Sequence, residues 1–411
     1  MYETKPWLKY YGDVPHTVDY PRITMYEGLQ KTAERTPGAI AYDFLGYKST
    51  YKTFLDEIDR CANVLAGLGL RKGDRVTISM PTSPQGIICF YAVNRLGAAA
   101  SMIHPLSTES EIEFYVNVSK SRFALTLDAF YGKFRNVMNK TNLEKVILAR
   151  IPDYLGLVKK VGFNLTKGKL IPKVPDDPDF LWWKDLMSKK FPAVPKADMN
   201  PDDLAVILYS GGTTGKPKGI MLSNFNFVAH GIMVSKWGNL DHTDAVLAIL
   251  PIFHGFGLGV CVNAAFMGGA KSILVPQFTP EDVAKLIKSK RPTFIIGVPT
   301  LYEALNKNEI FQNTNLSCLK AAFSGADGLP RVVKERFEEI VRRQKGSVKL
   351  LEGYGLTEAV TAIVATPLGE YRENSIGIPF SDMDAKIVKM DTFDEADPGE
   401  EGELCVRGPA V

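Results

Sequence analysis

The chain has 411 residues, of which 45% are hydrophobic and 23% are charged, and its formal net charge at pH 7 is +3. This size and composition are typical of a globular protein of two or three domains with a large core. The small net charge, and the lack of a basic run interleaved with aromatic residues, argue against nucleic-acid binding and favour small-molecule chemistry.

The cysteines and the apolar regions exclude other classes. The five cysteines are far apart and include no C-x-x-C pair, so they fit neither a disulfide framework nor a zinc site. The first residues lack the basic start and apolar segment of a signal peptide, which favours a cytoplasmic location. The longest apolar region, 246–270, is interrupted by Pro251, His254 and several glycines, so we interpret it as strand, loop and helix.

In the first part of the chain, predicted helices and strands alternate. Thr24 and Glu27 form a capping box that opens a helix to about residue 36, and a second capping box begins at Thr108. Residues 52–66 place apolar side chains on one helical face. Further predicted elements are strands at 75–80, 98–103, 123–127 and 146–148 and a helix at 84–96. The alternation is typical of a doubly wound parallel sheet.

Residues 150–196 interrupt this alternation. From Lys145 to Lys196 the chain has 11 Lys or Arg against 5 Asp, and residues 154–161 are able to form a short helix with one apolar face beside two lysines. One interpretation is a patch that makes weak contact with a membrane surface and collects an amphiphilic substrate, which would make the protein peripheral to the membrane. The other is a solvated connection between two subdomains.

The second part returns to alternation and predicts another doubly wound sheet. Its predicted strands are 204–208, 245–250, 272–275, 293–297, 320–323 and 348–351, with helices at 260–266, 280–288, 299–305 and 331–343. Short strands near 377–379, 384–388 and 402–407 predict a small β-barrel-like unit. We therefore expect α/β subdomains at about 1–200 and 201–355 and a small β subdomain at 356–411.

The loop between the predicted strand 204–208 and the apolar residues 220–222 has the composition of a phosphate site. Glycines there allow backbone N–H groups to approach an anion, hydroxyls add donors and lysines add charge. The candidate phosphate-binding residues are Ser210, Gly211, Gly212, Thr213, Thr214, Gly215, Lys216 and Lys218. The spacing does not match the P-loop, because Ser210 and Pro217 replace its Gly and Ser or Thr. Taken alone, the loop is equally consistent with a solvated turn.

Three further loops follow strands of the second predicted sheet, where such folds bind ligands. They are 251–257, 323–330 and 352–359. The last combines Tyr354, Thr357 and Glu358 with glycines. A carboxylate beside a phosphate site suits Mg²⁺, which proteins bind through one or two carboxylates plus substrate phosphates. We therefore predict Glu358 as the metal ligand.

Together these motifs resemble the adenylate-forming superfamily of acyl- and aryl-CoA synthetases, peptide-synthetase adenylation domains and beetle luciferases. The resemblance rests on Tyr209 to Gly219, Tyr354 to Glu358, and Gly402 to Pro409, in order, and 73–76 also fits. It implies an AMP-binding enzyme that uses ATP, Mg²⁺ and coenzyme A to activate a carboxylic acid through an acyl-adenylate. The cradle would hold the β- and γ-phosphates.

The resemblance also implies roles for the other loops. The adenine-binding residues would be Ser324, Gly325, Ala326, Tyr354 and Gly355, and the catalytic residues Thr357, Glu358 and His254. Asp327-Gly328 departs from the Ala-Pro common in the family, which leaves the details of the adenine loop open. Without the family context, Tyr354 and His254 would be interpreted as core residues, and Glu358 as a helix-start carboxylate.

The loop at His254 bears on the choice of substrate. Amino-acid-activating members usually carry an Asp in this loop, and here Phe253, His254 and Gly255 provide no carboxylate, which favours an uncharged acid. An apolar acyl pocket is expected from Phe253, Phe256, Val298, Tyr302, Gly353 and Val360. With the basic segment 150–196, this favours medium- or long-chain fatty acids over aryl acids.

The resemblance further implies that the family's hinge and its small lysine-bearing C-terminal domain would follow residue 411, so we expect this polypeptide alone to bind its substrates with little ligase activity. Two alternatives stay open. One is a fatty acyl-AMP ligase that loads a carrier protein, and the other is a non-catalytic module that binds acyl groups or nucleotides.

Overall fold

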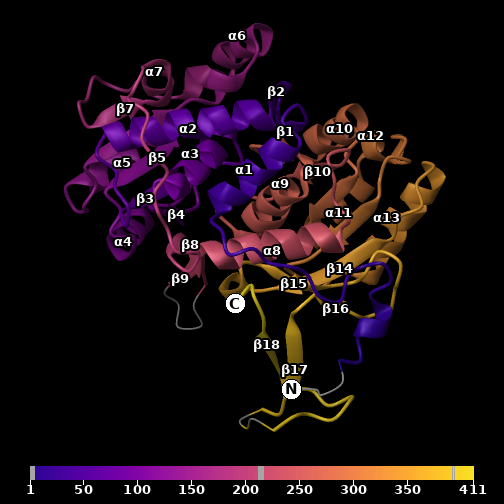
Figure 1. The fold of residues 1–411 in the computed structure, drawn as a ribbon. Coiled ribbons are helices and arrows are strands. Elements are labelled where there is room, and N and C mark those ends of the chain that lie inside the picture. The colour runs from indigo at the N-terminus through magenta and orange to yellow at the C-terminus, as the bar shows by residue number, and fades with distance from the viewer. Residues whose placement is uncertain (1–4, 212–216, 391, 393) are drawn as a thin grey trace.

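The computed structural model describes residues 5–211, 217–390, 392 and 394–411, and its backbone forms two large sheets flanked by helices (Figure 1). The predicted α/β class is confirmed. In the described part of the chain no helix is both long and apolar enough to cross a membrane.

The first sheet has seven strands in the order β7-β6-β5-β3-β4-β8-β9, and only β9 runs antiparallel to its neighbour. Its strands are β3 (Arg75–Ser79), β4 (Ala99–Met102), β5 (Phe123–Leu127), β6 (Lys145–Ala149), β7 (Phe180–Trp182), β8 (Leu204–Ser210) and β9 (Lys218–Ser223). The helices of this part are α2 (Tyr51–Gly67), α3 (Pro84–Arg95), α4 (Glu109–Ser119), α5 (Tyr131–Met138), α6 (Leu157–Leu165) and α7 (Trp183–Ser188). Short 3₁₀ turns are η2 (Asp128–Phe130), η3 (Ile151–Tyr154) and η4 (Lys167–Leu170).

The second sheet has nine strands in the order β16-β15-β14-β13-β12-β10-β11-β1-β2. They are β1 (Ile40–Phe44), β2 (Tyr47–Thr50), β10 (Ala245–Ala248), β11 (Lys271–Leu274), β12 (Phe294–Gly297), β13 (Ala321–Ser324), β14 (Leu350–Gly355), β15 (Ala362–Ala365) and β16 (Ile378–Pro379). The helices here are α1 (Met25–Arg35), α8 (Asn224–Trp237), α9 (Ala265–Gly268), α10 (Pro280–Lys290), α11 (Pro299–Asn306), α12 (Glu309–Gln312) and α13 (Arg331–Arg343). A 3₁₀ turn η1 (Leu8–Tyr10), a π-helix η5 (Phe256–Ala264) and a 3₁₀ turn η6 (Thr357–Ala359) complete the elements outside the small sheet.

One continuous apolar core joins the two sheets. It includes Ile78 of β3, Phe90 of α3, Phe227 of α8 and Phe294 of β12. Helix α3 is buried at every position from Pro84 to Asn94, as expected for a helix that is apolar on all sides and packed between layers. Separate cores under α4 and α5 and under α10, α11 and α13 cover the outer faces of the sheets.

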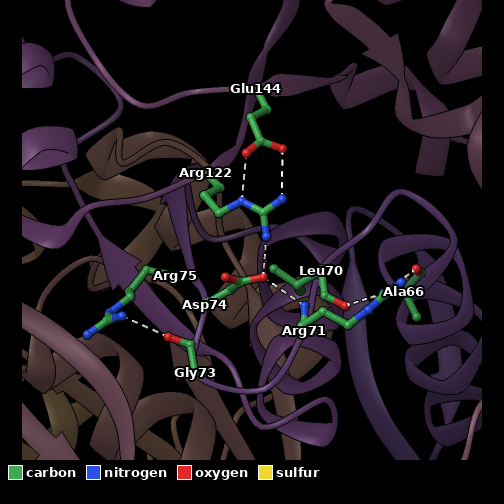
Figure 2. Close-up of polar contacts among 8 residues, drawn as sticks. All are labelled: Ala66, Leu70, Arg71, Gly73, Asp74, Arg75, Arg122 and Glu144. Atoms are coloured by element: carbon green, nitrogen blue, oxygen red, sulfur yellow. Dashed lines mark hydrogen bonds and ion pairs between the residues drawn. The ribbon is translucent and has the colours of Figure 1, made fainter.

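An ion-pair network ties together the amino ends of three strands in the first sheet (Figure 2). Asp74 accepts hydrogen bonds from the Arg71 backbone N–H at 2.8 Å and from Arg122 at 2.7 Å. The Arg122 guanidinium also makes two parallel bonds to Glu144, at 2.7 and 2.9 Å. These residues immediately precede β3, β5 and β6. The family-like residues 73–76 therefore have a structural role here, at the edge of the sheet away from the strands' carboxyl ends.

The strands do not follow the subdomain ranges expected from the sequence. The hairpin β8–β9 belongs to the first sheet although it lies after residue 200, and the unpredicted pair β1–β2 joins the second sheet through β11. In the described residues, the predicted small barrel is a two-stranded antiparallel sheet of β17 (Asp384–Val388) and β18 (Glu403–Arg407). The reason is that β15 and β16 continue the nine-stranded sheet through backbone pairing with β14.

Candidate active site

The predicted phosphate cradle lies at the turn of the β8–β9 hairpin. Ser210, the last residue of β8, pairs with Lys218, the first residue of β9, and both Gly211 and Lys218 are exposed. The other predicted cradle residues, which are Gly212, Thr213, Thr214, Gly215 and Lys216, lie outside the described residues. The hairpin lies beside η6, which contacts both of its strands. The chain therefore brings the stem of the cradle next to Thr357 and Glu358.

Glu358 has the properties expected of a ligand for a cation that arrives with its substrate. It is exposed, and within the described ranges its carboxylate has no hydrogen-bond or ion-pair partner. No group of three metal-ligating side chains occurs in the described part of the chain. A single unpaired carboxylate beside a phosphate loop fits Mg²⁺, which keeps several waters and takes its remaining ligands from substrate phosphates.

The residue after η6 has an unusual backbone. Val360 has φ 67° and ψ −60°, and the Thr361 N–H donates to the Ala359 carbonyl at 2.7 Å across it. This is a γ-turn of the rare kind with positive φ. For a β-branched residue such a conformation costs about 1–3 kcal/mol, so it persists only where its surroundings hold it in place. Val360 is fully buried.

Two glycines fix the neighbouring loops against this turn. A Cβ at Gly255 would lie 2.0 Å from the Val360 carbonyl oxygen, and a Cβ at Gly355 would lie 1.9 Å from that of Thr361. Both contacts are with backbone, which has no flexible end to move aside. The close approach of these glycines thus packs the loop after β10 and the end of β14 directly on the segment that carries Thr357 and Glu358.

A cavity opens between these loops at the carboxyl ends of the second sheet's parallel strands. The space inside it is about 780 Å³, a figure that counts the part open to solvent. Of the predicted site residues, eight line it: His254, Phe256, Ser324, Gly325, Ala326, Gly353, Tyr354 and Gly355. Residues predicted for the adenine site and for the acyl pocket thus share one cavity.

One end of this cavity is polar. The Ser324 hydroxyl is buried and has no hydrogen-bond partner among the described residues, as expected if a ligand supplies the partner. The Tyr354 side chain is 40% exposed at the same end. The Nδ1 of His254 accepts from the Phe256 backbone N–H at 3.1 Å, and desolvation lowers the pKa of this imidazole. From that hydrogen bond we assign the neutral tautomer, which carries its proton on Nε2.

The other end is apolar, and sequence reasoning missed most of its lining. Four of the missed residues, Val234, Trp237, Gly238 and Leu240, come from the end of α8 and the turn after it. The rest come from the second sheet and its surroundings: Val260, Phe294, Ile296, Phe323, Thr361, Ala362, Ala365 and Phe380. Two residues in the sequence could have indicated the bounds of α8: Ser223, which caps its first turn, and Gly238, which follows its last residue.

Four residues predicted for the acyl pocket do not line this cavity. The Tyr302 hydroxyl lies 2.7 Å from the Phe323 carbonyl and 2.9 Å from that of Ile295, so it braces two strands from the outer face. Val298 packs on that outer core, and Val360 is enclosed in its γ-turn. The Phe253 ring packs 4.4 Å from the ring of His104. Tyr302 lies on α11 and Val298 precedes its first residue, and this helix packs on the outer face of the second sheet, which keeps both residues away from the cavity.

The geometry agrees with comparisons to known proteins. Residues 29–411 match the family described as AMP-binding enzyme, and the chain belongs to this family. The long-chain-fatty-acid–CoA ligase of Bacillus subtilis is 33% identical over 419 residues, which cover 100% of this chain and 74% of the relative. The corresponding ligase of Escherichia coli O157:H7 is 33% identical over 423 residues, covering 99% and 73%.

Solved structures share the fold. A long-chain-fatty-acid-CoA ligase from Archaeoglobus fulgidus superposes with a TM-score of 0.81 at 24% identity, over 96% of this chain and 76% of that one. At this identity the likeness establishes the adenylate-forming fold alone.

Proposed function

We propose that the protein activates a fatty acid with ATP and transfers the acyl group to coenzyme A. In the first step a carboxylate oxygen attacks the α-phosphorus of ATP, pyrophosphate leaves, and an acyl-adenylate forms. In the second step the thiolate of coenzyme A attacks the acyl carbonyl carbon and AMP leaves. The observation that carries the proposal is one cavity with a polar end at Ser324 and Tyr354 and an apolar interior, beside Thr357 and Glu358.

The polar end suits the nucleotide. Ser324 to Ala326 and Tyr354 with Gly355 border the space for adenine, and the unpartnered Ser324 hydroxyl supplies a hydrogen bond there. Ser210, Gly211 and Lys218, at the stem of the cradle, are assigned to the β- and γ-phosphates. Thr357 donates to phosphate, and Glu358 would hold Mg²⁺, which would supply positive charge to stabilise the phosphate oxygens.

His254 suits the acid. It lines the cavity together with Ser324 and Tyr354, and desolvation lowers its pKa, which favours the neutral imidazole. The neutral ring is a hydrogen-bond donor through Nε2 without adding a charge that would need desolvation. We assign it to orient the substrate carboxylate towards the α-phosphate.

The direct test has two assays. The first measures acid-dependent pyrophosphate release with acetate, benzoate, octanoate, palmitate and a set of amino acids. The second measures transfer of the acyl group to coenzyme A or to a carrier protein. We expect release with fatty acids and transfer to coenzyme A. Release with amino acids only would contradict the assignment of His254. Transfer only to a carrier protein would favour an acyl-AMP ligase, and binding without release would favour a non-catalytic module.

We also propose that residues 150–196 make peripheral contact with an anionic membrane surface. The supporting observation is α6, at the upper rim of the molecule in Figure 1. Its residues Leu157, Val158, Val161 and Leu165 are 58–87% exposed. At 3.6 residues per turn these side chains fall within about 100° of the helix surface. Lys160 lies next to this face on the helix, and Lys169 and Lys173 follow α6 in the sequence, which matches the chemistry of an interfacial helix on acidic lipids.

This contact predicts the effect of one substitution. Val158→Asp puts a charge on the apolar face, and we expect it to weaken binding to phosphatidylglycerol-containing vesicles by about ten-fold, as loss of one buried apolar side chain implies. Val332→Asp on α13, where the valine is 71% exposed, makes the same change elsewhere and is expected to leave binding unaltered. Co-sedimentation measures both. Equal binding by the two variants, or self-association through α6 without vesicle binding, would refute the contact.

A further inference from the structure

The apolar end of the cavity is closed by three residues that meet one another. Gly238, Leu240 and Phe294 all line the cavity, and a Cβ at Gly238 would lie 3.4 Å from Phe294 Cε1 and 3.5 Å from Leu240 Cγ. Phe294 is only 2% exposed. The side chains of Leu240 and Phe294, with the Gly238 backbone close to both, thus form a floor.

The wall beside this floor is fixed. The Trp237 indole N–H donates to the Thr366 carbonyl at 3.4 Å, and its ring packs 4.6 Å from Phe380 and 5.3 Å from Tyr11. Leu240 is held below the end of α8 because its N–H donates to the Ser235 carbonyl at 2.9 Å. Leu240 is also half-buried and packs against the core that joins the two sheets.

The strand register gives the depth from the polar end to the floor. Ser324 of β13 pairs with Gly297, the last residue of β12. Phe294 is the first residue of β12 and pairs with Ala321 of β13. At roughly 3.3 Å per residue, the three-residue step is about 10 Å. An extended acyl chain with single bonds near 1.5 Å advances roughly 1.25 Å per carbon, so this depth holds about eight carbons.

We infer that Gly238, Leu240 and Phe294 set the acyl chain length, and that the preferred substrate is a medium-chain acid of about eight carbons. The inference rests on the proposed function, because it places the carboxylate beside His254, at the polar end of the cavity. The relatives described above are named long-chain-fatty-acid–CoA ligases, so the acyl chain inferred here is shorter than the one in their names. A longer chain has to displace Leu240 or Phe294, both of which are packed.

The test measures binding of non-hydrolysable acyl-adenylate analogues, in which a sulfamate replaces the phosphate, by calorimetry. The acyl groups are butanoyl, hexanoyl, octanoyl, dodecanoyl and hexadecanoyl. We expect affinity to rise to octanoyl and then fall by about ten-fold or more at dodecanoyl, as overpacking of a closed site implies. Leu240→Ala removes part of the floor and shifts the optimum to longer chains, and Gly238→Leu fills the end and shifts it to shorter ones.

Controls separate the possible failures. Leu106→Ala, at a 64% exposed leucine in the loop after β4, is the matched control for Leu240→Ala and is expected to leave the length profile unchanged. Binding of AMP by each variant reports whether it is folded. Tighter binding of hexadecanoyl than octanoyl analogues by the unaltered protein, or a profile that neither substitution shifts, would refute the floor and leave the proposed function standing. Failure to bind any analogue at all would refute the proposed function itself.

Discussion

Glu358→Gln lowers the rate of acyl-adenylate formation by about 100-fold or more, the effect typical of removing one electrostatic group from a charged transition state. The amide keeps the shape of the side chain and loses the charge that holds Mg²⁺ against the phosphates. Acid binding is expected to stay within about two-fold, because Glu358 lies outside the apolar part of the cavity. Single-turnover formation of acyl-AMP from octanoate and ATP over a range of Mg²⁺ concentrations measures the effect.

The matched control is Glu370→Gln. Glu370 is an exposed carboxylate in the loop after β15, so the variant makes the same chemical change in the same region of sequence. We expect an unchanged rate for this variant and a raised Mg²⁺ requirement for Glu358→Gln alone. An unchanged rate and Mg²⁺ requirement in Glu358→Gln would mean that another group binds the metal.

Gly255→Ala has the second largest expected effect. Its new Cβ would lie 2.0 Å from the Val360 carbonyl oxygen, so either the loop that carries His254 or the segment that carries Thr357 and Glu358 has to move. We expect the free energy of unfolding to fall by about 1–3 kcal/mol, the usual cost of overpacking. Because both loops border the cavity, we also expect binding of an octanoyl-adenylate analogue to weaken by about ten-fold or more. Urea unfolding and calorimetry measure the two effects.

Gly132→Ala on α5 is the corresponding control. Nothing lies within 4 Å of a Cβ at Gly132, and alanine has the higher helix propensity, so stability is expected to stay the same or to rise slightly. If Gly255→Ala binds the analogue as tightly as the unaltered protein, then the contact with Val360 does not position the site.

Much of the fold was predictable from local signals. The capping boxes at Thr24 and Thr108 are present in the structure, and the predicted strand 123–127 is β5 with the same bounds. The main omission is α8, which is buried on nearly all sides and therefore lacks the apolar periodicity that identifies a surface helix. The pair β1–β2 was missed for another reason, since its partner β11 is more than 200 residues away and local patterns carry no information about such pairing.

The candidate site was predictable where it depends on chain order alone. Loops that follow parallel strands meet at one edge of a sheet, so the sequence was sufficient to predict that Ser324, Tyr354 and His254 lie together. The wall from Trp237 to Leu240 was not predictable, because it depends on how α8 packs across the sheet. Tyr302 shows the converse problem: an aromatic residue near the right strands lies on their other face, bound to two backbone carbonyls.

The strained turn at Val360 lowers the stability of the fold while it positions the residues proposed for adenylation. Holding this residue at φ 67° uses about 1–3 kcal/mol that the rest of the fold has to supply. A change that relaxed the turn would therefore make the chain more stable and at the same time release the segment that carries Thr357 and Glu358. Selection or engineering for thermal stability alone would favour such a change, so stabilised variants of this protein need to be screened for adenylation as well as for folding.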